Sequence, residues 1–422
     1  DVPTTPIIEW FRAGGGPIRE FNQSYVVPVP ATLTLTDLTA AFTAVTNHHD
    51  ALRMRLHRTP DTHTHTHTHT DTDTDTGTGT DRWTLHIPPP GTIDTTNWIH
   101  HVDTTGLDPH TTHQTLIHEA QKARTRLDPE QGITAQLVWL DAGNDHDGQL
   151  LIVIHHLVID GVSWRILLDD LATAHHALTT HQPLHLEPVA TSFRGWATAL
   201  TQTATHNRWT SQLPYWENML AAPHTPLGAT PLDPTRDTLA TAQTVTLALP
   251  EHETEQLLTA VPAAFRAGIN DVLLTALTLA LRQWAPTHTH NGILIDLESH
   301  GRHEDTLDSG HDLTRTIGWF TTMHPVRINP GTLTWTEVTT AGPQIGTALK
   351  HVKEQLRAIP DHGLGYGLLR HLNPHTAPTL ATHPHPLIGF NYLGRFTTDT
   401  RDGTAQHWTS VTHTDTGNSI GE

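Results

Sequence analysis

Two adjacent histidines, followed at a short fixed distance by an Asp-Gly pair, are the residues of this sequence best suited to chemistry. His155 and His156 follow an apolar run at 150–154, and Asp160-Gly161 comes four residues after the second histidine. Imidazole takes up and releases protons near neutral pH, which is what a general base needs. A histidine pair alone usually bonds backbone or water, but the Asp-Gly pair at this offset favours the general base.

The elements around these histidines can be predicted from the spacing of apolar residues. The uninterrupted apolar run 150–154 is typical of a strand buried on both faces. The Asp-Gly pair predicts a turn, and Asp160 or Ser163 can cap the helix that follows. Apolar residues then recur at helical spacing to about Leu178. Strand, turn and helix together hold an imidazole at the mouth of a core.

A second apolar strand, 293–297, ends in a similar way. It is followed by Glu298-Ser-His and then Gly301-Arg302. An ionisable residue and a glycine thus follow a buried strand twice in the chain. We expect one such site in each of two lobes that face each other across a cleft.

Length and composition limit the class of protein. A chain of 422 residues is too long for one ordinary core, and we expect an N-terminal lobe at 1–180, a linker at 181–190 and a C-terminal lobe at 191–422. The absence of cysteine excludes disulfides, thiolate nucleophiles and cysteine-bound metals. A formal net charge of −19 argues against nucleic acid or an anionic membrane as partner.

The chain offers no sign of export or membrane insertion. The first six residues lack a signal-peptide pattern, and no apolar run has the length of a membrane span. We therefore expect a soluble cytoplasmic protein. A threonine-rich repeat with His, Asp and Gly fills 62–80, and its lack of apolar residues predicts a disordered loop at 60–81. Adventitious metal binding by its histidines has little weight, and no dedicated metal site is expected.

Other patterns predict further elements. Helices are expected at 36–46, 111–126 and 270–282, a strand at 241–249, and an antiparallel hairpin of 135–140 with 150–154. Arg53 falls in an apparent strand at 52–56. A buried arginine there requires an acid, for which Asp160 is a candidate.

Taken in order, these segments resemble the epimerization domains of non-ribosomal peptide synthetases, which belong to the condensation-domain superfamily. The histidine motif HHLVIDGVSW alone is typical of the superfamily, whereas the segments containing WFT, GLGYG and FNYLG are specific to the epimerization branch. The matching segments cover nearly the whole chain, at 6–11, 155–164, 298–302, 315–326, 360–370 and 390–396.

The resemblance implies an α/β fold of two chloramphenicol-acetyltransferase-like lobes, arranged as a V-shaped pseudo-dimer with the active site in a tunnel between them. It implies the interconversion of L and D configurations at the Cα of an aminoacyl or peptidyl thioester. The domain itself would bind no cofactor. The phosphopantetheine arm belongs to an upstream peptidyl carrier protein domain, and the other partners are the adjacent synthetase domains.

The resemblance also assigns the two catalytic residues. His156 corresponds to the catalytic histidine of the family, and Glu298 to the glutamate that acts as the opposing acid or base. Inversion requires that a proton leaves one face of Cα and arrives at the other, and this fits one group from each lobe.

The remaining site residues follow from the same comparison. Asn391 and Tyr392 correspond to positions near the site, where they could hydrogen-bond the thioester oxygen or orient the substrate. His155 is expected to position the substrate or the catalytic ring. Five residues have expected structural roles at the site, with Asp160 paired to Arg53: Asp160, Gly161, Arg53, Ser163 and Trp164.

The sequence departs from the family in ways that bear on activity. Ser299 stands where glycine is usual and could crowd Glu298, and His324 replaces a more usual tyrosine. The chain also ends soon after the FNYLG segment, so we expect a second lobe that lacks the strand and closing helix of other members.

Three other functions fit parts of the sequence. In a condensation domain that forms peptide bonds, His156 would serve an attacking amine, but Glu298 and FNYLG favour epimerization. A docking domain without activity would fit the short C-terminus, but intact His156 and Glu298 argue against it. A metal-dependent hydrolase lacks the necessary HExxH spacing.

Overall fold

The computed structural model describes residues 1–59, 81–221, 233, 235–285, 292–307, 310–383, 385–394 and 407–408. The predicted disordered loop at 60–81 lies outside these residues except for Asp81, and so does the end of the chain after residue 408. Each of the two compact units of the chain has its own sheet and its own core.

The chain passes between the two units more than once. The first unit comprises Asp1–Ala204, His300–Thr321 and Leu393–Glu422, and the second comprises Thr205–Ser299 and Thr322–Tyr392. The predicted boundary at 181–190 would place residues 191–204 and 300–321 in the C-terminal lobe, whereas the structure places both in the first unit. Both segments bond to the first unit, since the backbone of Phe193 donates to Asp50 and the Arg302 guanidinium pairs with Asp160.

The first unit is built on a four-stranded sheet in the order β1-β6-β5-β4. Its strands are β1 (Asn22–Val29), β4 (Ile99–Asp103), β5 (Ala135–Asp141) and β6 (Gly148–His155). β5 and β6 are antiparallel, as the predicted hairpin requires. Residues 150–154 of β6 are fully buried, which confirms the strand covered on both faces.

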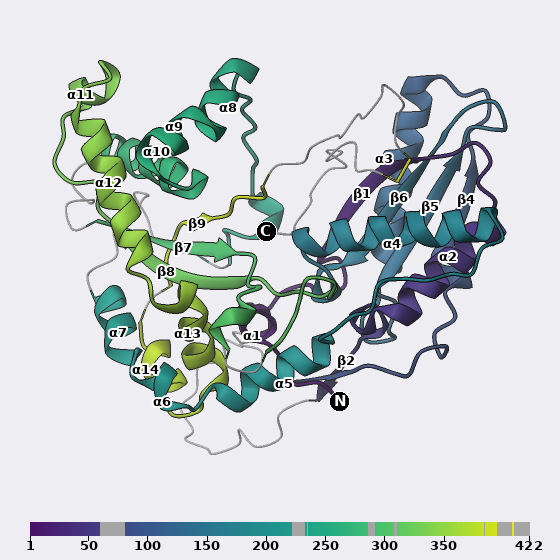
Figure 1. The fold of residues 1–422 in the computed structure, drawn as a ribbon, viewed down its shortest axis with the longest axis horizontal. Coiled ribbons are helices and arrows are strands. Elements are labelled where there is room, and N and C mark those ends of the chain that lie inside the picture. Colours follow the sequence, from purple (N-terminus) through teal and green to yellow (C-terminus); the bar gives the residue numbers. More distant parts are fainter. Residues whose placement is uncertain are drawn as a thin grey trace. The chain divides into compact units, whose positions relative to one another are not determined.

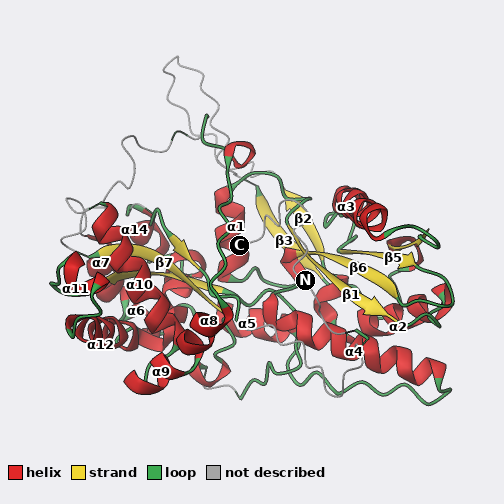
Figure 2. Cartoon of the chain, turned by 90° about the horizontal axis from the view of Figure 1, so that it is seen from above, coloured by secondary structure: helices red, strands yellow, loops and turns green. Residues whose placement is uncertain are grey.

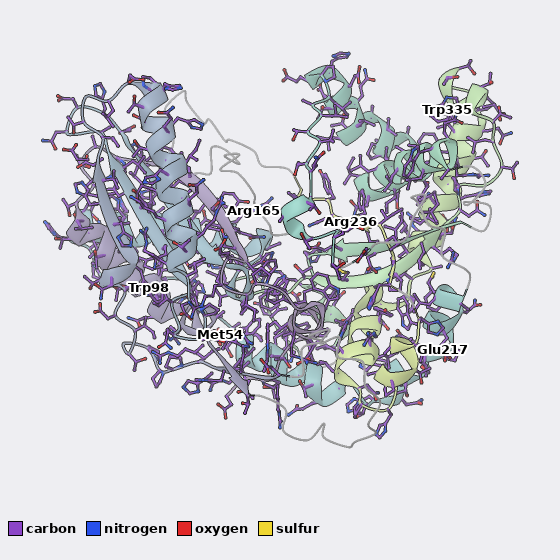
Figure 3. All side chains as sticks on the ribbon, turned by 180° about the vertical axis from the view of Figure 1, so that it is seen from behind. Met54, Trp98, Arg165, Glu217, Arg236 and Trp335 are labelled. Atoms are coloured by element: carbon purple, nitrogen blue, oxygen red, sulfur yellow. The ribbon has the colours of Figure 1, made fainter. Side chains whose placement is uncertain are left out.

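Helices cover both faces of this sheet (Figures 1 and 2). α3 (Pro109–Arg126) packs on one face, where Leu116 and Ala120 join Val138 and Val153 in a buried cluster. On the other face lie α2 (Leu35–His48) and α4 (Gly161–Thr179), which pack against each other. All three helices confirm the sequence predictions. Within this unit Met54 and Trp98 are buried side chains (Figure 3).

The second unit contains a three-stranded sheet in the order β8-β7-β9. Its strands are β7 (Ile293–Ser299), β8 (Thr322–Ile328) and β9 (Gly389–Phe390). α10 (Ile269–Trp284) and α12 (Gln344–Arg357) cover one face, where Leu274 and Val352 pack against Ile295. The predictions of a helix at 270–282 and a buried strand at 293–297 are therefore confirmed.

Shorter elements complete the described part of the chain. They are α1 (Pro6–Gly14), β2 (Arg55–Thr59), β3 (Arg82–His86), α5 (Phe193–Thr203), α6 (Asn207–Thr210), α7 (Leu213–Ala221), α8 (Glu251–Leu258), α9 (Ala260–Phe265), α11 (Trp335–Thr339), α13 (Leu364–Gly367) and α14 (Ala377–Ala381). Among the described residues no single helix has the length and apolarity of a membrane span. One pair of described helical segments reaches that length and apolarity only when the two are counted together: Glu251–Phe265 and Ile269–Trp284. The chain bends by 102° between them.

Two local predictions are wrong. The strand predicted at 241–249 does not form, and Val245 and Leu247 of this segment are 84% and 90% exposed. Alternation of apolar residues indicates a strand only where a neighbouring strand accepts its hydrogen bonds, and no described strand does so here. Arg53 ends a short 3₁₀ turn (Asp50–Arg53), and the strand begins only at Arg55.

Candidate active site

His155 is the last residue of β6 and is completely buried. Its Nε2 lies 2.8 Å from the carbonyl oxygen of Ile18, and its Nδ1 lies 3.2 Å from the backbone N–H of Leu157. Burial lowers the pKa of His155 to about 4. Bonded to backbone at both nitrogens and uncharged at neutral pH, this ring fixes the end of the strand.

His156 opens the short turn between β6 and α4 and is 2% exposed. Its ring stacks on Phe21, with centroids 4.8 Å apart, and lies 4.6 Å from the ring of Trp319. Its Nε2 lies 3.0 Å from Nε2 of Gln23. Burial lowers the pKa of His156 to about 4, because the apolar rings around it offer no solvation to an imidazolium. His156 is therefore neutral at pH 7 and able to accept a proton.

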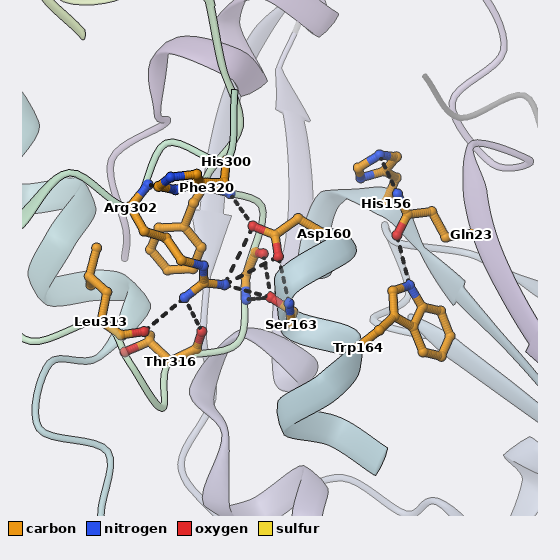
Figure 4. A network of polar contacts seen from close by, with 11 residues as sticks. Gln23, His156, Asp160, Ser163, Trp164, His300, Arg302, Leu313, Thr316 and Phe320 are labelled. Atoms are coloured by element: carbon orange, nitrogen blue, oxygen red, sulfur yellow. Dashed lines mark hydrogen bonds and ion pairs between the residues drawn. The ribbon is translucent and has the colours of Figure 1, made fainter. Parts of the chain in front are cut away.

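Asp160 caps α4 and connects it to a distant segment of the same unit (Figure 4). Its carboxylate accepts hydrogen bonds from the backbone N–H of Ser163 at 2.7 Å and of Phe320 at 3.1 Å. It also forms an ion pair with Arg302 at 3.2 Å, and both side chains are at most 7% exposed. These contacts hold the turn after His156 against residues 302–320.

The predicted pairing of Arg53 with Asp160 is wrong. The Arg53 guanidinium donates to the carbonyl oxygens of Thr46, Asn47 and His49 at 2.7–3.2 Å, and to that of Pro88 at 3.1 Å. The last carbonyls of a helix lack intrahelical donors, and an arginine just beyond α2 supplies them. Arg302 takes the position at Asp160 that we had expected for Arg53.

Ser163 and Trp164, on the first turn of α4, bond in different directions. The Ser163 hydroxyl donates to the carbonyl oxygen of Gly318 at 2.9 Å and accepts from Arg302 at 2.9 Å. The Trp164 indole donates to Oε1 of Gln23 at 2.7 Å. A Cβ added to Gly161 would meet no atom within 4 Å, so packing does not explain that glycine.

In the second unit, Glu298 lies on the face of β7 opposite to the core. Ile295 and Leu297 point into the cluster with Phe390, and alternation turns Glu298 to the other face. β7 and β9 are parallel and pair Leu297 with Phe390. The pairing ends at Phe390, and Asn391 and Tyr392 follow directly after β9 in the chain.

Ser299 does not share a face with Glu298, against the expectation that it could crowd the carboxylate. As the next residue of β7, it points to the opposite side. Its hydroxyl lies 2.7 Å from that of Thr322 on β8. The serine that stands in place of the usual glycine therefore forms a cross-strand hydrogen bond with Thr322.

The glycine-rich segment 363–367 allows the close backbone approach that its composition predicts. Gly363 has a φ of +83°, and a Cβ there would lie 2.0 Å from the ring of His324. A Cβ on Gly365 would lie 2.1 Å from Oε1 of Gln212. Gly363 is required for both its positive φ and the space at His324, whereas a side chain at position 365 would displace the end of Gln212.

A second carboxyl, Asp296, lies two residues before Glu298 on the same face of β7. Its partners in register are Pro325 and Gly389, neither of which carries a charge. Burial raises the pKa of Asp296 from 3.8 to about 7. Burial also raises the pKa of Tyr366 to about 12, and the charge of Asp296 contributes to that increase.

We expect Asp296→Asn to stabilise the protein at pH 8 but not near pH 4. The folded chain retains the Asp296 proton that the unfolded chain releases above pH 3.8, so this group lowers stability as pH rises toward 7. At about 1.4 kcal/mol per pKa unit, the gain at pH 8 is on the order of 2–4 kcal/mol. Urea unfolding of both proteins at pH 4 and pH 8 measures it, and equal gains at both values would contradict the titration.

Another buried polar cluster ties α2 to α4. His49 Nε2 lies 2.7 Å from Asp170, which also forms an ion pair with Arg315. The potential ligand atoms of His48, His49 and Asp170 lie within 4.8 Å of one another, as in a metal site. The guanidinium of Arg315 already supplies positive charge to this carboxylate.

Several residues at His156 had no predicted role. Gln23, Phe21, Trp319 and Arg302 all contact His156 or the Asp160 network. Trp319 and Arg302 lie in segments that we used for the resemblance, so their position was a usable signal. Phe21 and Gln23 lie outside the matching segments, between 6–11 and 155–164, and the pairing of β1 with β6 brings this part of the chain to the histidines.

Comparison with protein-family models decides the family. The model described as the condensation domain matches residues 92–413. The chain belongs to the condensation-domain family. Domains of this family bind no cofactor themselves, and the phosphopantetheine arm is on the carrier protein.

Relatives of this condensation-family chain are large synthases. It is 36% identical over 402 residues to chondramide synthase cmdD of Chondromyces crocatus, and 33% identical over 408 residues to tyrocidine synthase 2 of Brevibacillus parabrevis. These alignments cover 93% and 96% of the chain. The chain spans only 9% and 10% of the two relatives.

Solved structures share its two-lobed, chloramphenicol-acetyltransferase-like α/β fold. The epimerization domain from the third module of tyrocidine synthetase B is 30% identical, with a TM-score of 0.75 over 93% of this chain and 81% of that one. The first condensation domain of the calcium-dependent antibiotic synthetase, at 15% identity and a TM-score of 0.62 over 93% and 80%, shares the fold alone. The sequence-based resemblance to the epimerization branch is thereby confirmed at the level of the family.

Proposed function

We propose that this chain epimerises an L-aminoacyl or peptidyl thioester, on the phosphopantetheine arm of a carrier protein, to the D form. The observation that carries the proposal is Glu298, an acid on the face of β7 opposite to the core, in a chain that also holds a neutral, buried His156. The 30% identity to a solved epimerization domain supports it.

The two groups would divide the chemistry of inversion. A thioester acidifies its Cα–H, so proton removal gives an enolate without a bound cofactor. One of His156 and Glu298 removes the proton and the other returns one to the opposite face. The enolate oxygen also needs a hydrogen-bond donor, for which we propose the side chain of Asn391 or Tyr392.

The same proposal implies partners and location. The substrate would arrive from an upstream peptidyl carrier protein domain within a cytoplasmic synthetase, as part of D-amino-acid incorporation in antibiotic biosynthesis. The negative net charge of the chain makes overall charge attraction a poor basis for that docking. We propose that contacts with the carrier are local.

Peptide-bond condensation is the second candidate, because the matching family model is that of the condensation domain. There His156 would serve an amine attacking the thioester. Amide formation needs no proton transfer on a second face of Cα, so it gives no role to Glu298.

Deuterium exchange separates the two candidates. A peptidyl carrier protein loaded with L-aminoacyl thioesters is incubated with the chain in deuterated water, and the released acids are analysed for Cα deuterium and D/L ratio. We expect deuterium incorporation together with movement toward a mixture of D and L. Absence of exchange, with amide formed when an acceptor aminoacyl carrier is added, would favour condensation instead.

A further inference from the structure

Gln23 lies between the histidine and a tryptophan, and its carboxamide has only one consistent orientation. It is on β1, paired in register with Ile154 of β6. Figure 4 shows its side chain between Trp164 and His156. The Trp164 indole N–H, which only donates, lies 2.7 Å from Oε1 of Gln23. The amide oxygen therefore faces Trp164 and the NH₂ group faces His156.

This orientation determines the tautomer of His156. The NH₂ group of Gln23 can only donate, and it lies 3.0 Å from His156 Nε2. Nε2 must then accept, so it carries the lone pair, and the ring proton of the neutral histidine is on Nδ1. Nδ1 of His156 is buried.

His155 is fixed in the opposite tautomer. The backbone N–H of Leu157 donates to its Nδ1, so its proton lies on Nε2, which donates to the carbonyl oxygen of Ile18. Two consecutive histidines thus present opposite nitrogens as acceptors. His155 serves as an internal reference for His156.

We propose that Gln23, held by Trp164, is a positioning residue that makes Nε2 the proton-accepting atom of His156 and keeps the ring neutral before substrate binds. The inference rests on the proposed role of His156 in proton transfer. An imidazolium would bring an Nε2–H against the NH₂ group of Gln23. The amide cannot turn its oxygen to that proton without leaving the Trp164 N–H without its acceptor.

Two aromatic rings restrict the plane of the imidazole at this contact. Phe21 stacks on it with an interplanar angle of 12°, and Trp319 lies against it at 41°. Substrate must then displace the Gln23 NH₂ group from Nε2 to reach the lone pair. The displaced NH₂ group remains next to the reacting atoms, because its oxygen is still held by Trp164.

Neutron diffraction from crystals exchanged into deuterated buffer tests the tautomer without any substrate. We expect deuterium on Nδ1 of His156 and on Nε2 of His155. Deuterium on Nε2 of His156 would overturn the proposal, whatever reaction the chain catalyses. A chain without epimerase activity but with the expected deuterium positions would refute the proposed function and leave the tautomer assignment correct.

The variant Gln23→Glu tests the effect on proton affinity. A carboxylate accepts from Nε2–H and still accepts from Trp164, so it stabilises the imidazolium. We expect the acidic limb of the pH profile of Cα exchange, which follows the His156 pKa of about 4, to move upward by at least about one pH unit, so that the rate at pH 4 falls roughly fivefold or more. An unchanged profile would overturn the proposal.

A matched control is Gln149→Glu, which makes the same chemical change on an exposed position of β6. It adds the same charge to the same sheet at a position that bonds to neither histidine. We expect its pH profile to match that of the wild type. An equal shift in both variants would assign the effect to net charge and would contradict a specific role of Gln23.

Discussion

Replacing His156 with glutamine should lower the rate of Cα deuterium exchange roughly 10²–10⁴-fold for thioesters of one configuration. Glutamine keeps a polar group of similar reach but cannot take up a proton. If two groups act on opposite faces, the enantiomer deprotonated by His156 loses exchange. The other enantiomer, deprotonated by Glu298, still loses its proton but cannot be inverted.

The complementary variant Glu298→Gln should show the reverse preference. It should suppress exchange of the enantiomer that the His156 variant still exchanges, because that enantiomer would be deprotonated by Glu298. Glu298 lies on β7, in a different sheet from the strand that ends at the histidines. The measurement is the exchange rate of separately prepared L- and D-aminoacyl thioesters on the carrier. Together the two variants identify which group removes the proton from the L form.

Control variants separate this chemistry from general effects of substitution. His118→Gln on α3 and Glu255→Gln on α8 change exposed side chains in the same way. We expect both to retain the wild-type rates with both enantiomers. Equal loss of exchange from both enantiomers in either site variant would contradict the division of labour between two proton-transfer groups.

The local frame of His156 could be predicted because neighbouring residues determine it. A run of five apolar residues bounded by turn residues is typical of a buried strand, and an aspartate three residues before Ser163 is suited to cap a helix. β6, the turn and α4 follow from such short-range rules. The helices predicted at 36–46, 111–126 and 270–282 were correct for the same reason.

The partner of Asp160 could not be predicted because it depends on tertiary structure. Arg53 and Arg302 are both buried arginines, and a sequence does not rank them as partners of a given acid. Carbonyls at the end of α2 capture Arg53, while a segment 142 residues after Asp160 supplies Arg302. Tertiary contacts of this kind also explain why residues 300–321 belong to the first unit although they follow most of the second unit in the chain.

Whether a predicted segment forms a strand also depends on a partner strand beside it. Residues 293–297 pair with β8 and β9, whereas the segment 241–249 pairs with no described strand and forms none. The neighbours of His156 depend on sheet register in the same way. Gln23 is 133 residues from His156, and nothing in either segment alone indicates that their side chains meet.

Arg302→Met should destabilise the first unit by about 3–5 kcal/mol, because it leaves the Asp160 carboxylate buried without its counter-charge. The side chains of the pair are only 7% and 5% exposed. Arg302 also donates to the carbonyl oxygens of Leu313 and Thr316 at 2.8 and 2.7 Å, and its guanidinium lies 4.1 Å from the ring centroid of Phe320. Urea unfolding at pH 7 measures the loss.

The double variant Asp160→Asn/Arg302→Met separates the ion pair from the other contacts of Arg302. An amide keeps the oxygen that caps α4 but removes the uncompensated charge, so the double variant should be more stable than Arg302→Met alone. Arg58→Met, which breaks an exposed pair with Asp81 in the same unit, should cost only about 0–1 kcal/mol. A loss at Arg302 as small as that at Arg58 would mean that water reaches Asp160, and the turn behind His156 would then depend on the cap alone.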